Sequence, residues 1–434
     1  MKMTDIYEIA EYTLKALKNC GADAAQCIVG RSKKDELNVD GGKFSLMRST
    51  FNTSISMKAI KDGKKGVTSI NQATKEAIDE AAAQCIAAAE SSVPDEAEQI
   101  ASFTAKVEYK TGVFEPDLNK LFDRIEEFMS QTKKEYPKVI LEQLISDYEH
   151  SEKLYMNTNG TSLRYEHGEY SFNTMFSAHE GEKASSFNGY FCALDNLDKP
   201  FMDAGMQRQL LEESEKQLNT VSPSEKFVGK VIYSPDCFNE LLQTALENFA
   251  SSGVLIDGTS PWKDALNTKV ASEKLNLRSV PLDGRTVVGQ RFTSDGYPAE
   301  NMDIIVDGVL KTFILSQYGA NKTGFPRALN GGNNLEVLPG DKTLEEMISG
   351  IDRGLIVNRF SGGQPSSNGD FSGVAKNSFL IENGKVSSAV SETMISGNII
   401  DMLNNIVVIS KEQTTDGLSF MPWAEFDGVT VSGK

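Results

Sequence analysis

Residues 218–230 read LNTVSPSEKFVGK, and this polar stretch separates two parts of the chain that differ in character. It contains Pro223 and Gly229, and such stretches are typical of domain boundaries. We therefore predict two domains, residues 1–220 and residues 221–434. The length of 434 residues favours this division, since single hydrophobic cores rarely grow beyond about 250–300 residues.

The part after this stretch alternates short apolar segments with glycine-containing turns, such as SDGYP at 294–298 and ENGK at 382–385. Beyond residue 270, only residues 343–350 and 398–404 have a helical pattern. Frequent turns at short spacing predict a mostly-β C-terminal domain, either a sandwich or barrel-like.

The part before the stretch combines helices with extended segments. Helical spacing or composition predicts helices at 4–19, 73–90, 117–136 and 203–218. Turn pairs separate four short strands between residues 26 and 70, and two longer extended segments follow at 138–149 and 162–193. We predict an α+β protein whose N-terminal α/β domain packs helices on a mostly antiparallel sheet.

Composition excludes several classes of function. The formal net charge of −17 argues against a nucleic-acid partner, because such proteins need a positive face. We find no apolar run long enough to span a bilayer and no signal peptide, so we expect a cytoplasmic protein. The chain has five cysteines and three histidines: Cys20, Cys27, Cys85, Cys192, Cys237, His150, His167 and His179. The odd cysteine count predicts free thiols, and we expect His167 and His179 on a sheet surface.

Residues 238–253, FNELLQTALENFASSG, predict an amphipathic helix with one apolar stripe. The stripe consists of Phe238, Leu241, Leu242, Ala245 and Phe249. Neither a P-loop, a dinucleotide-binding fingerprint nor a GxSxG motif occurs in the chain. The residues alone therefore indicate a two-domain α+β protein without a recognisable catalytic motif.

Several phrases in one order resemble the TldD/PmbA family, also called the modulator-of-DNA-gyrase family. They are TSDGYPAENMDIIVDGVLKTFILSQYGANKTG (293–324), RALNGGNNLEVLPGDKTLEEM (327–347) and GDFSGVAKNSFLIENGKVSSAVSETMISGNIIDMLNNI (369–406). CGADAAQ (20–26) and NQATKEAIDEAAAQCIAAAE (71–90) resemble the family's N-terminal domain, so the resemblance covers nearly the whole chain.

The resemblance implies a role in proteolysis. TldD-type members resemble zinc metallopeptidases with HExxxH on a C-terminal-domain helix and a cysteine near the C-terminus, whereas PmbA/TldE-like members lack the motif. The motif positions match Gln243, Thr244 and Asn248 here, and no cysteine follows Cys237. Imidazole and thiolate are the usual zinc ligands, so we expect no catalytic residue, metal or other cofactor in this chain and zinc in a TldD-like partner.

The same resemblance suggests a peptide groove formed by Asn333, Asn334, Asp370 and Ser372. The strand after Asn334 could present an edge to an extended peptide. We expect a PmbA/TldE-like subunit that pairs with a TldD-like zinc peptidase and contacts extended or unfolded peptide. Two alternatives stay open at this point: a stand-alone homodimer that binds peptides without catalysis, and an active metallopeptidase with atypical ligands.

Overall fold

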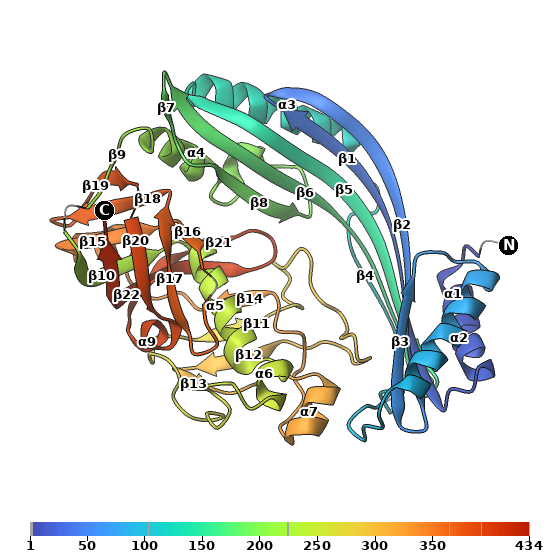
Figure 1. Ribbon diagram of the computed structural model, residues 1–434. Helices are drawn as coiled ribbons and strands as arrows, with labels where there is room; N and C mark the ends of the chain where they lie inside the picture. Colours follow the sequence, from blue (N-terminus) through green and yellow to red (C-terminus); the bar gives the residue numbers. More distant parts are fainter. Residues whose placement is uncertain (1–2, 103, 224, 364, 392, 434) are drawn as a thin grey trace.

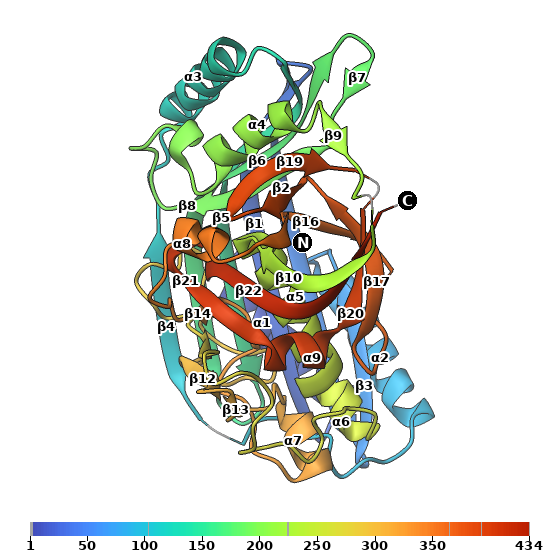
Figure 2. The same ribbon diagram turned by 90° about the vertical axis from the view of Figure 1, so that its left-hand side faces the viewer.

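The computed structural model describes residues 3–102, 104–223, 225–363, 365–391 and 393–433. Its strands form two sheets, one within residues 24–194 and the other within residues 220–432. The first sheet is strongly curved, and the second part of the chain lies on its concave side (Figure 1). In the view at right angles, the second part covers the long strands over much of their length (Figure 2). The α+β class predicted from the sequence is confirmed.

The first sheet contains the longest strands. They are β1 (Ala24–Asp40), β2 (Lys43–Lys61), β3 (Lys64–Ile70), β4 (Lys106–Gly112), β5 (Val139–Asn157), β6 (Ser162–Glu180), β7 (Lys183–Ala184) and β8 (Asn188–Leu194). The order is β3-β2-β1-β5-β6-β4, with β7 and β8 also paired to β6. Among the described strands of this sheet, only the β4–β6 pair is parallel. The prediction of four short strands between residues 26 and 70 is wrong, because β1 pairs with β5 continuously from Gln26 to Asp40.

Helices α1 (Ile6–Asn19), α2 (Lys75–Ser91) and α3 (Leu118–Glu135) lie outside the curve of this sheet (Figure 1). Each begins after a capping side chain, from Asp5, Thr74 or Asp117, that accepts a backbone N–H of the first turn. A fourth helix, α4 (Gln207–Lys216), precedes the second part. These helices confirm the predicted segments to within a few residues at each end.

The second sheet is built from shorter strands. They are β9 (Thr220–Val221), β10 (Phe227–Tyr233), β11 (Leu277–Ser279), β12 (Met302–Val306), β13 (Val309–Leu310), β14 (Leu335–Val337), β15 (Arg353–Val357), β16 (Arg359–Gly362), β17 (Asp370–Lys376), β18 (Ser378–Glu382), β19 (Lys385–Val390), β20 (Thr393–Asn398), β21 (Ile406–Thr415) and β22 (Phe420–Ser432). Its main path is β13-β12-β11-β14-β22-β10-β15-β18-β19-β9, and β20 and β21 also pair with β22. This part is mostly β, as predicted.

Five helices accompany the second sheet: α5 (Pro235–Ala250), α6 (Ser252–Ile256), α7 (Gln317–Thr323), α8 (Leu344–Ser349) and α9 (Ile399–Asn404). The predicted helices at 343–350 and 398–404 correspond to α8 and α9. Helix α7 was missed, because its seven residues include Gly319 and show no apolar period. Ser316 caps its start, and Gly324, with φ of 77°, ends it. None of the described helices has the length and apolar character needed to cross a membrane.

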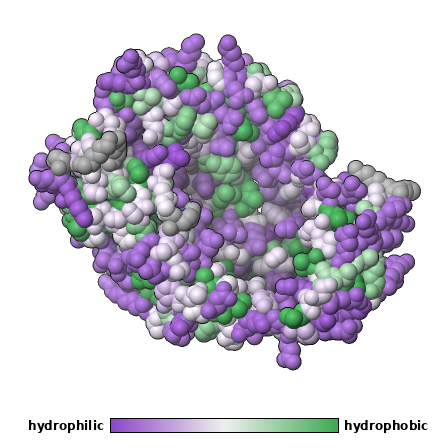
Figure 3. Space-filling view, in the orientation of Figure 1, coloured by the Kyte–Doolittle hydropathy of each residue, from purple (hydrophilic) through white to green (hydrophobic). Residues whose placement is uncertain are grey.

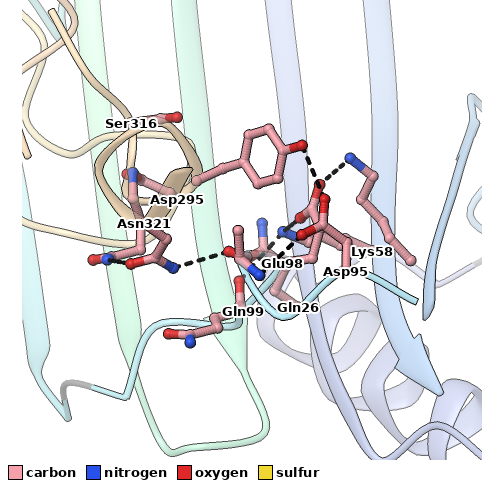
Figure 4. A network of polar contacts seen from close by, with 12 residues as sticks. Gln26, Lys58, Asp95, Glu98, Gln99, Asp295, Ser316 and Asn321 are labelled. Atoms are coloured by element: carbon pink, nitrogen blue, oxygen red, sulfur yellow. Dashed lines mark hydrogen bonds and ion pairs between the residues drawn. The ribbon is translucent and has the colours of Figure 1, made fainter. Parts of the chain in front are cut away.

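The two parts of the chain touch at both ends of the curved sheet. At one end they share a hydrophobic cluster that includes Phe176 and Leu210 from the first part and Phe379 and Trp423 from the second. The predicted division at residue 220 stays a prediction, since this cluster belongs to both parts. At the other end, α7 docks on the segment 95–99 (Figure 4).

The contacts of α7 are polar. Lys322 Nζ lies 2.8 Å from the Asp95 carboxylate, and the Tyr318 hydroxyl donates to the same carboxylate at 3.1 Å. Asn321 donates its amide to the carbonyl oxygen of Ala97 at 2.8 Å. Hydrogen bonds from Lys322 lower the pKa of Asp95, which keeps that carboxylate charged. The space between the sheet and the second part is thus bounded at both ends.

Candidate functional site

Helix α5 borders this space, and its local sequence explains where it begins. The Ser234 hydroxyl accepts the backbone N–H of Cys237 at 3.4 Å, and Pro235 occupies the first helical position. The predicted apolar stripe is confirmed, because Phe238, Leu241, Leu242, Ala245 and Phe249 are all buried. Buried packing therefore fixes one side of α5, and the opposite side is free to border a cavity.

A cavity of about 690 Å³ lies between α5, nearby loops of the second part and the concave face of the first sheet. Figure 3 shows the molecule hollowed between the two parts. Six side-chain amides line the cavity: Asn52, Asn239, Gln243, Gln290, Asn333 and Asn334. We call this space the amide cavity.

A second cavity of about 560 Å³ adjoins the first, since Asp416 lines both. We call it the acidic cavity because Asp236, Glu240 and Asp416 line it. Burial raises the pKa of Asp236 to about 6, and burial also raises the pKa of Glu240 against the opposing effect of Arg359. Burial raises the pKa of the neighbouring Cys237 thiol as well, so that thiol stays neutral and is a poor nucleophile.

The family-motif positions on α5 do not converge on one point. Gln243 lines the amide cavity and donates its amide to the Asn239 side chain at 3.3 Å. Thr244 lines a different and smaller cavity of about 80 Å³, and its hydroxyl donates to the Glu240 carbonyl oxygen at 2.8 Å. Asn248 is half-buried. At the three motif positions, α5 therefore carries two side-chain amides and one hydroxyl that is bonded to the helix backbone.

These residues do not fit a zinc ion. Zinc in proteins is held mostly by imidazole, thiolate and carboxylate groups. The three histidines lie on β5 and β6 of the first sheet, away from α5 in the sequence. Within the described ranges, no three or more His, Cys, Asp or Glu side chains are grouped so that they could hold a metal.

The structure brings two of the four groove candidates to the amide cavity. Asn333 and Asn334 line it together with Gln243. Asn334 has a left-handed backbone, with φ of 54°, and its amide donates to the carbonyl oxygens of Val288 and Leu418 at 2.9 and 3.0 Å. Asn334 therefore holds the cavity wall together.

The other two candidates lie elsewhere. Asp370 and Ser372 belong to β17, between β16 and β20, and neither lines the amide cavity. The Asp370 carboxylate accepts hydrogen bonds from the side chains of Asn398 and Asn368, both at 2.9 Å, and these bonds lower its pKa. The structure does not bring this pair to the amide cavity, and its role in a peptide groove stays a prediction.

The strand edge suggested for peptide pairing is occupied within the protein. Strand β14, which follows Asn334, pairs with β11 on one side and with β22 on the other. Both of its edges are occupied, so an added peptide strand has no free backbone groups to pair with there. A peptide bound in this region would therefore contact side chains and would not extend the sheet by backbone hydrogen bonds.

Sequence reasoning missed a buried histidine–carboxylate pair. His167 was expected on the surface, but its side chain is only 3% exposed, and its Nε2 lies 3.1 Å from Glu169 Oε2. The ring Nδ1 lies 3.1 Å from the Thr111 carbonyl oxygen, which favours the tautomer with the proton on Nδ1. Burial raises the pKa of Glu169 to about 7 and lowers that of His167. Both shifts favour the uncharged forms of Glu169 and His167, and the facing atoms of the two side chains lie close together without forming a hydrogen bond.

The comparisons with known proteins agree with this fold. Residues 226–433 match the domain described as PmbA/TldA metallopeptidase C-terminal domain, and residues 25–89 match PmbA/TldA metallopeptidase domain 1. The chain therefore belongs to the PmbA/TldD family of metallopeptidase-related proteins.

Named relatives include both branches of the family. A zinc metalloprotease TldD homolog from Saccharolobus solfataricus is 29% identical over 220 residues, which are 47% of this chain and 49% of that protein. Metalloprotease PmbA from Escherichia coli O157:H7 is 31% identical over 155 residues, which are 35% of this chain and 34% of that protein. The chain thus matches these curated relatives over about half of their length or less.

Solved structures resemble the whole chain in fold. TldE from Thermococcus kodakarensis has a TM-score of 0.83 at 22% identity, covering 98% of this chain and 100% of that chain. A putative modulator of DNA gyrase from Bacteroides thetaiotaomicron has a TM-score of 0.82 at 23% identity, with 100% of both chains covered. At these identities the likeness concerns the fold.

Proposed function

We propose that this chain is the PmbA/TldE-like subunit of a TldD-type zinc metalloprotease system and does not itself hold the catalytic zinc. One observation carries the proposal. On α5, where the family motif would place two imidazoles and a carboxylate, the chain has Gln243, Thr244 and Asn248, and the Thr244 hydroxyl is bonded to its own helix. A threonine in that state is neither a zinc ligand nor a general base.

The partner in this proposal is a TldD-like peptidase that supplies zinc and the general base. This chain contributes a wall of the reaction chamber and contacts the extended or unfolded peptide through the amide cavity. A side-chain amide carries both donors and acceptors, so it can pair with the main chain of a peptide irrespective of sequence. The proposal places the complex in the cytoplasm.

Co-expression with a TldD-like protein, followed by size-exclusion chromatography at micromolar concentration, tests the partnership. We expect one species that contains both chains and that cleaves an unfolded peptide. Two species that elute separately would contradict the subunit role. If this chain then elutes as a dimer that still binds peptide, the alternative of a stand-alone homodimeric binding protein replaces it.

A further inference from the structure

The amide cavity has a cationic corner formed by two residues from different parts of the chain. Lys153 lies on β5, and its cross-strand partner is Tyr165 on β6. Arg291 comes from a loop of the second part, and its guanidinium carbon lies 5.8 Å from the centroid of the Tyr165 ring. Lys153 Nζ lies 5.9 Å from the centroid of Phe292. Each cation therefore lies near one aromatic ring of the cavity wall, Arg291 near Tyr165 and Lys153 near Phe292.

Neither cation is paired with a carboxylate. Arg291 donates from Nη1 to the Pro281 carbonyl oxygen at 2.8 Å and also interacts with the Tyr165 side chain, so its guanidinium is held in place by uncharged groups. Throughout the described part of the chain, no carboxylate oxygen lies within ion-pair distance of Lys153 or Arg291. Two cations without an ion pair stand out in this chain, because acidic residues outnumber basic ones and its formal net charge is −17.

The other charged residues at the cavity are engaged within the protein. Arg31 donates to the carbonyl oxygen of Thr4, and Glu152 pairs with Arg164. Asp416 accepts the backbone N–H groups of Leu418 and Ser419 at 2.8 and 2.7 Å. Glu152 and Asp416 thus line the same cavity, but neither forms an ion pair with Lys153 or Arg291 in the described residues.

Two amides of the same cavity also lack partners. In the described residues, the side chains of Asn52 and Asn333 form no hydrogen bond, whereas Gln290 accepts one from the Gly331 backbone at 2.7 Å. Each free amide offers donors and an acceptor that match a peptide group. The cavity therefore combines groups for a peptide main chain with groups for an anion.

We propose that the amide cavity binds a peptide carboxylate between Lys153 and Arg291, while Asn52 and Asn333 hydrogen-bond the adjoining main chain. The carboxylate is either an acidic side chain or the C-terminus of the peptide, since both present the same group. This inference rests on the proposed peptide-binding role and adds a preference for acidic or carboxy-terminal segments. Guanidinium and ammonium groups bind carboxylates through charge-assisted hydrogen bonds, which are stronger than neutral ones.

The test uses the full purified chain and fluorescein-labelled, unstructured peptides that differ at one position, which carries Glu, Gln or Lys. Each peptide is made with a free and with an amidated C-terminus, and dissociation constants are measured by fluorescence anisotropy. We expect a peptide with the preferred carboxylate to bind roughly 10-fold more tightly than its neutral counterpart, because hydrogen bonds between charged groups are stronger than neutral ones. The Glu-against-Gln and free-against-amidated comparisons identify the source of the carboxylate.

Two variants locate the preference. Lys153→Gln and Arg291→Gln should each abolish most of the preference and leave the affinity for the neutral peptide unchanged. Lys15→Gln, on the exposed side of α1, is the matched control and should keep the preference. Arg291→Gln loses the hydrogen bond to Pro281, and this loss could disturb folding. Lys153 is exposed, so Lys153→Gln should fold normally and tests the site independently.

The outcomes separate this inference from the proposed function. Binding of all peptides with equal affinity, or a preference that survives Lys153→Gln, would overturn the carboxylate site and leave peptide binding intact. Failure of every peptide to bind would overturn both the site and the peptide-contacting role of this chain. Increasing salt should weaken binding of the carboxylate peptide more than that of the neutral one.

Discussion

The hydroxyl of Thr244 donates a hydrogen bond of 2.8 Å to the carbonyl oxygen of Glu240, one turn earlier on α5. A threonine that bonds back to its own helix contributes little to helix stability. We predict that Thr244→Ala changes the free energy of unfolding by less than about 0.5 kcal/mol, measured by urea titration.

The same variant tests the role of this position in chemistry. In a complex with a TldD-like partner, Thr244→Ala should leave the rate of peptide cleavage unchanged. A tenfold loss of cleavage in a complex that still forms would mean that this position takes part in the reaction.

Phe249 should matter far more for stability than for function. Its side chain is fully buried, and its ring centroid lies 5.1 Å from that of Trp262. We expect Phe249→Ala to lower the free energy of unfolding by about 3–5 kcal/mol, because the cavity left behind adds to the lost burial. Gln243→Ala, at an exposed position of the same helix, is the control and should stay within about 0.5 kcal/mol of the parent.

Asn334 has two separable roles in the wall of the amide cavity. Its left-handed backbone suits glycine, whereas its amide bridges Val288 and Leu418. We predict that Asn334→Ala destabilises the protein by about 1–3 kcal/mol through lost hydrogen bonds and backbone strain. Asn334→Gly should destabilise it less, because it removes only the bridge. Equal losses in urea denaturation would show that backbone strain is unimportant here.

Glu169 predicts a pH dependence of stability. Its pKa is raised by burial to about 7 in the folded state, against an ordinary value of about 4.3 in the unfolded chain. The folded state therefore binds a proton that the unfolded state releases, and this stabilisation is full below about pH 4.3 and lost as the pH rises through about 7.

Glu169→Gln should remove this dependence, because the amide is uncharged at every pH and has nearly the size of the carboxyl group. We expect the variant to gain on the order of 1–3 kcal/mol relative to the parent at pH 8, compared with pH 5, because one pKa unit corresponds to about 1.4 kcal/mol. Urea denaturation at both pH values measures the difference. Glu247→Gln, on the exposed side of α5, serves as control, and parallel pH profiles for parent and Glu169→Gln would contradict the assignment.

Local patterns in the sequence predicted much of the fold. The periodicity of 238–253 predicted α5 and its buried stripe. The helix begins earlier, at Pro235, because the Ser234 side chain caps its first turn. Helix α7 and strand β4 were missed. Both are short segments whose order depends on distant contacts, with Asp95 for α7 and with β6 for β4.

The candidate site was harder to predict than the fold. The resemblance identified Gln243 and Asn333, but their meeting with Lys153 depends on how the second part docks on the concave face, which no local pattern encodes. His167 was misjudged because β4 covers it: its Nδ1 lies 2.8 Å from the Thr111 hydroxyl. Alternation along β6 alone could not reveal that neighbour.

Metal analysis tests the central claim most directly. Zinc content is measured on the purified chain alone and on its complex with a TldD-like partner, together with chelator-sensitive cleavage of an unfolded peptide. The account predicts no stoichiometric zinc and no cleavage for the chain alone, and one zinc per heterodimer with cleavage for the complex. One zinc per chain in the isolated protein, with cleavage that a chelator abolishes, would contradict the account and favour an active metallopeptidase with atypical ligands.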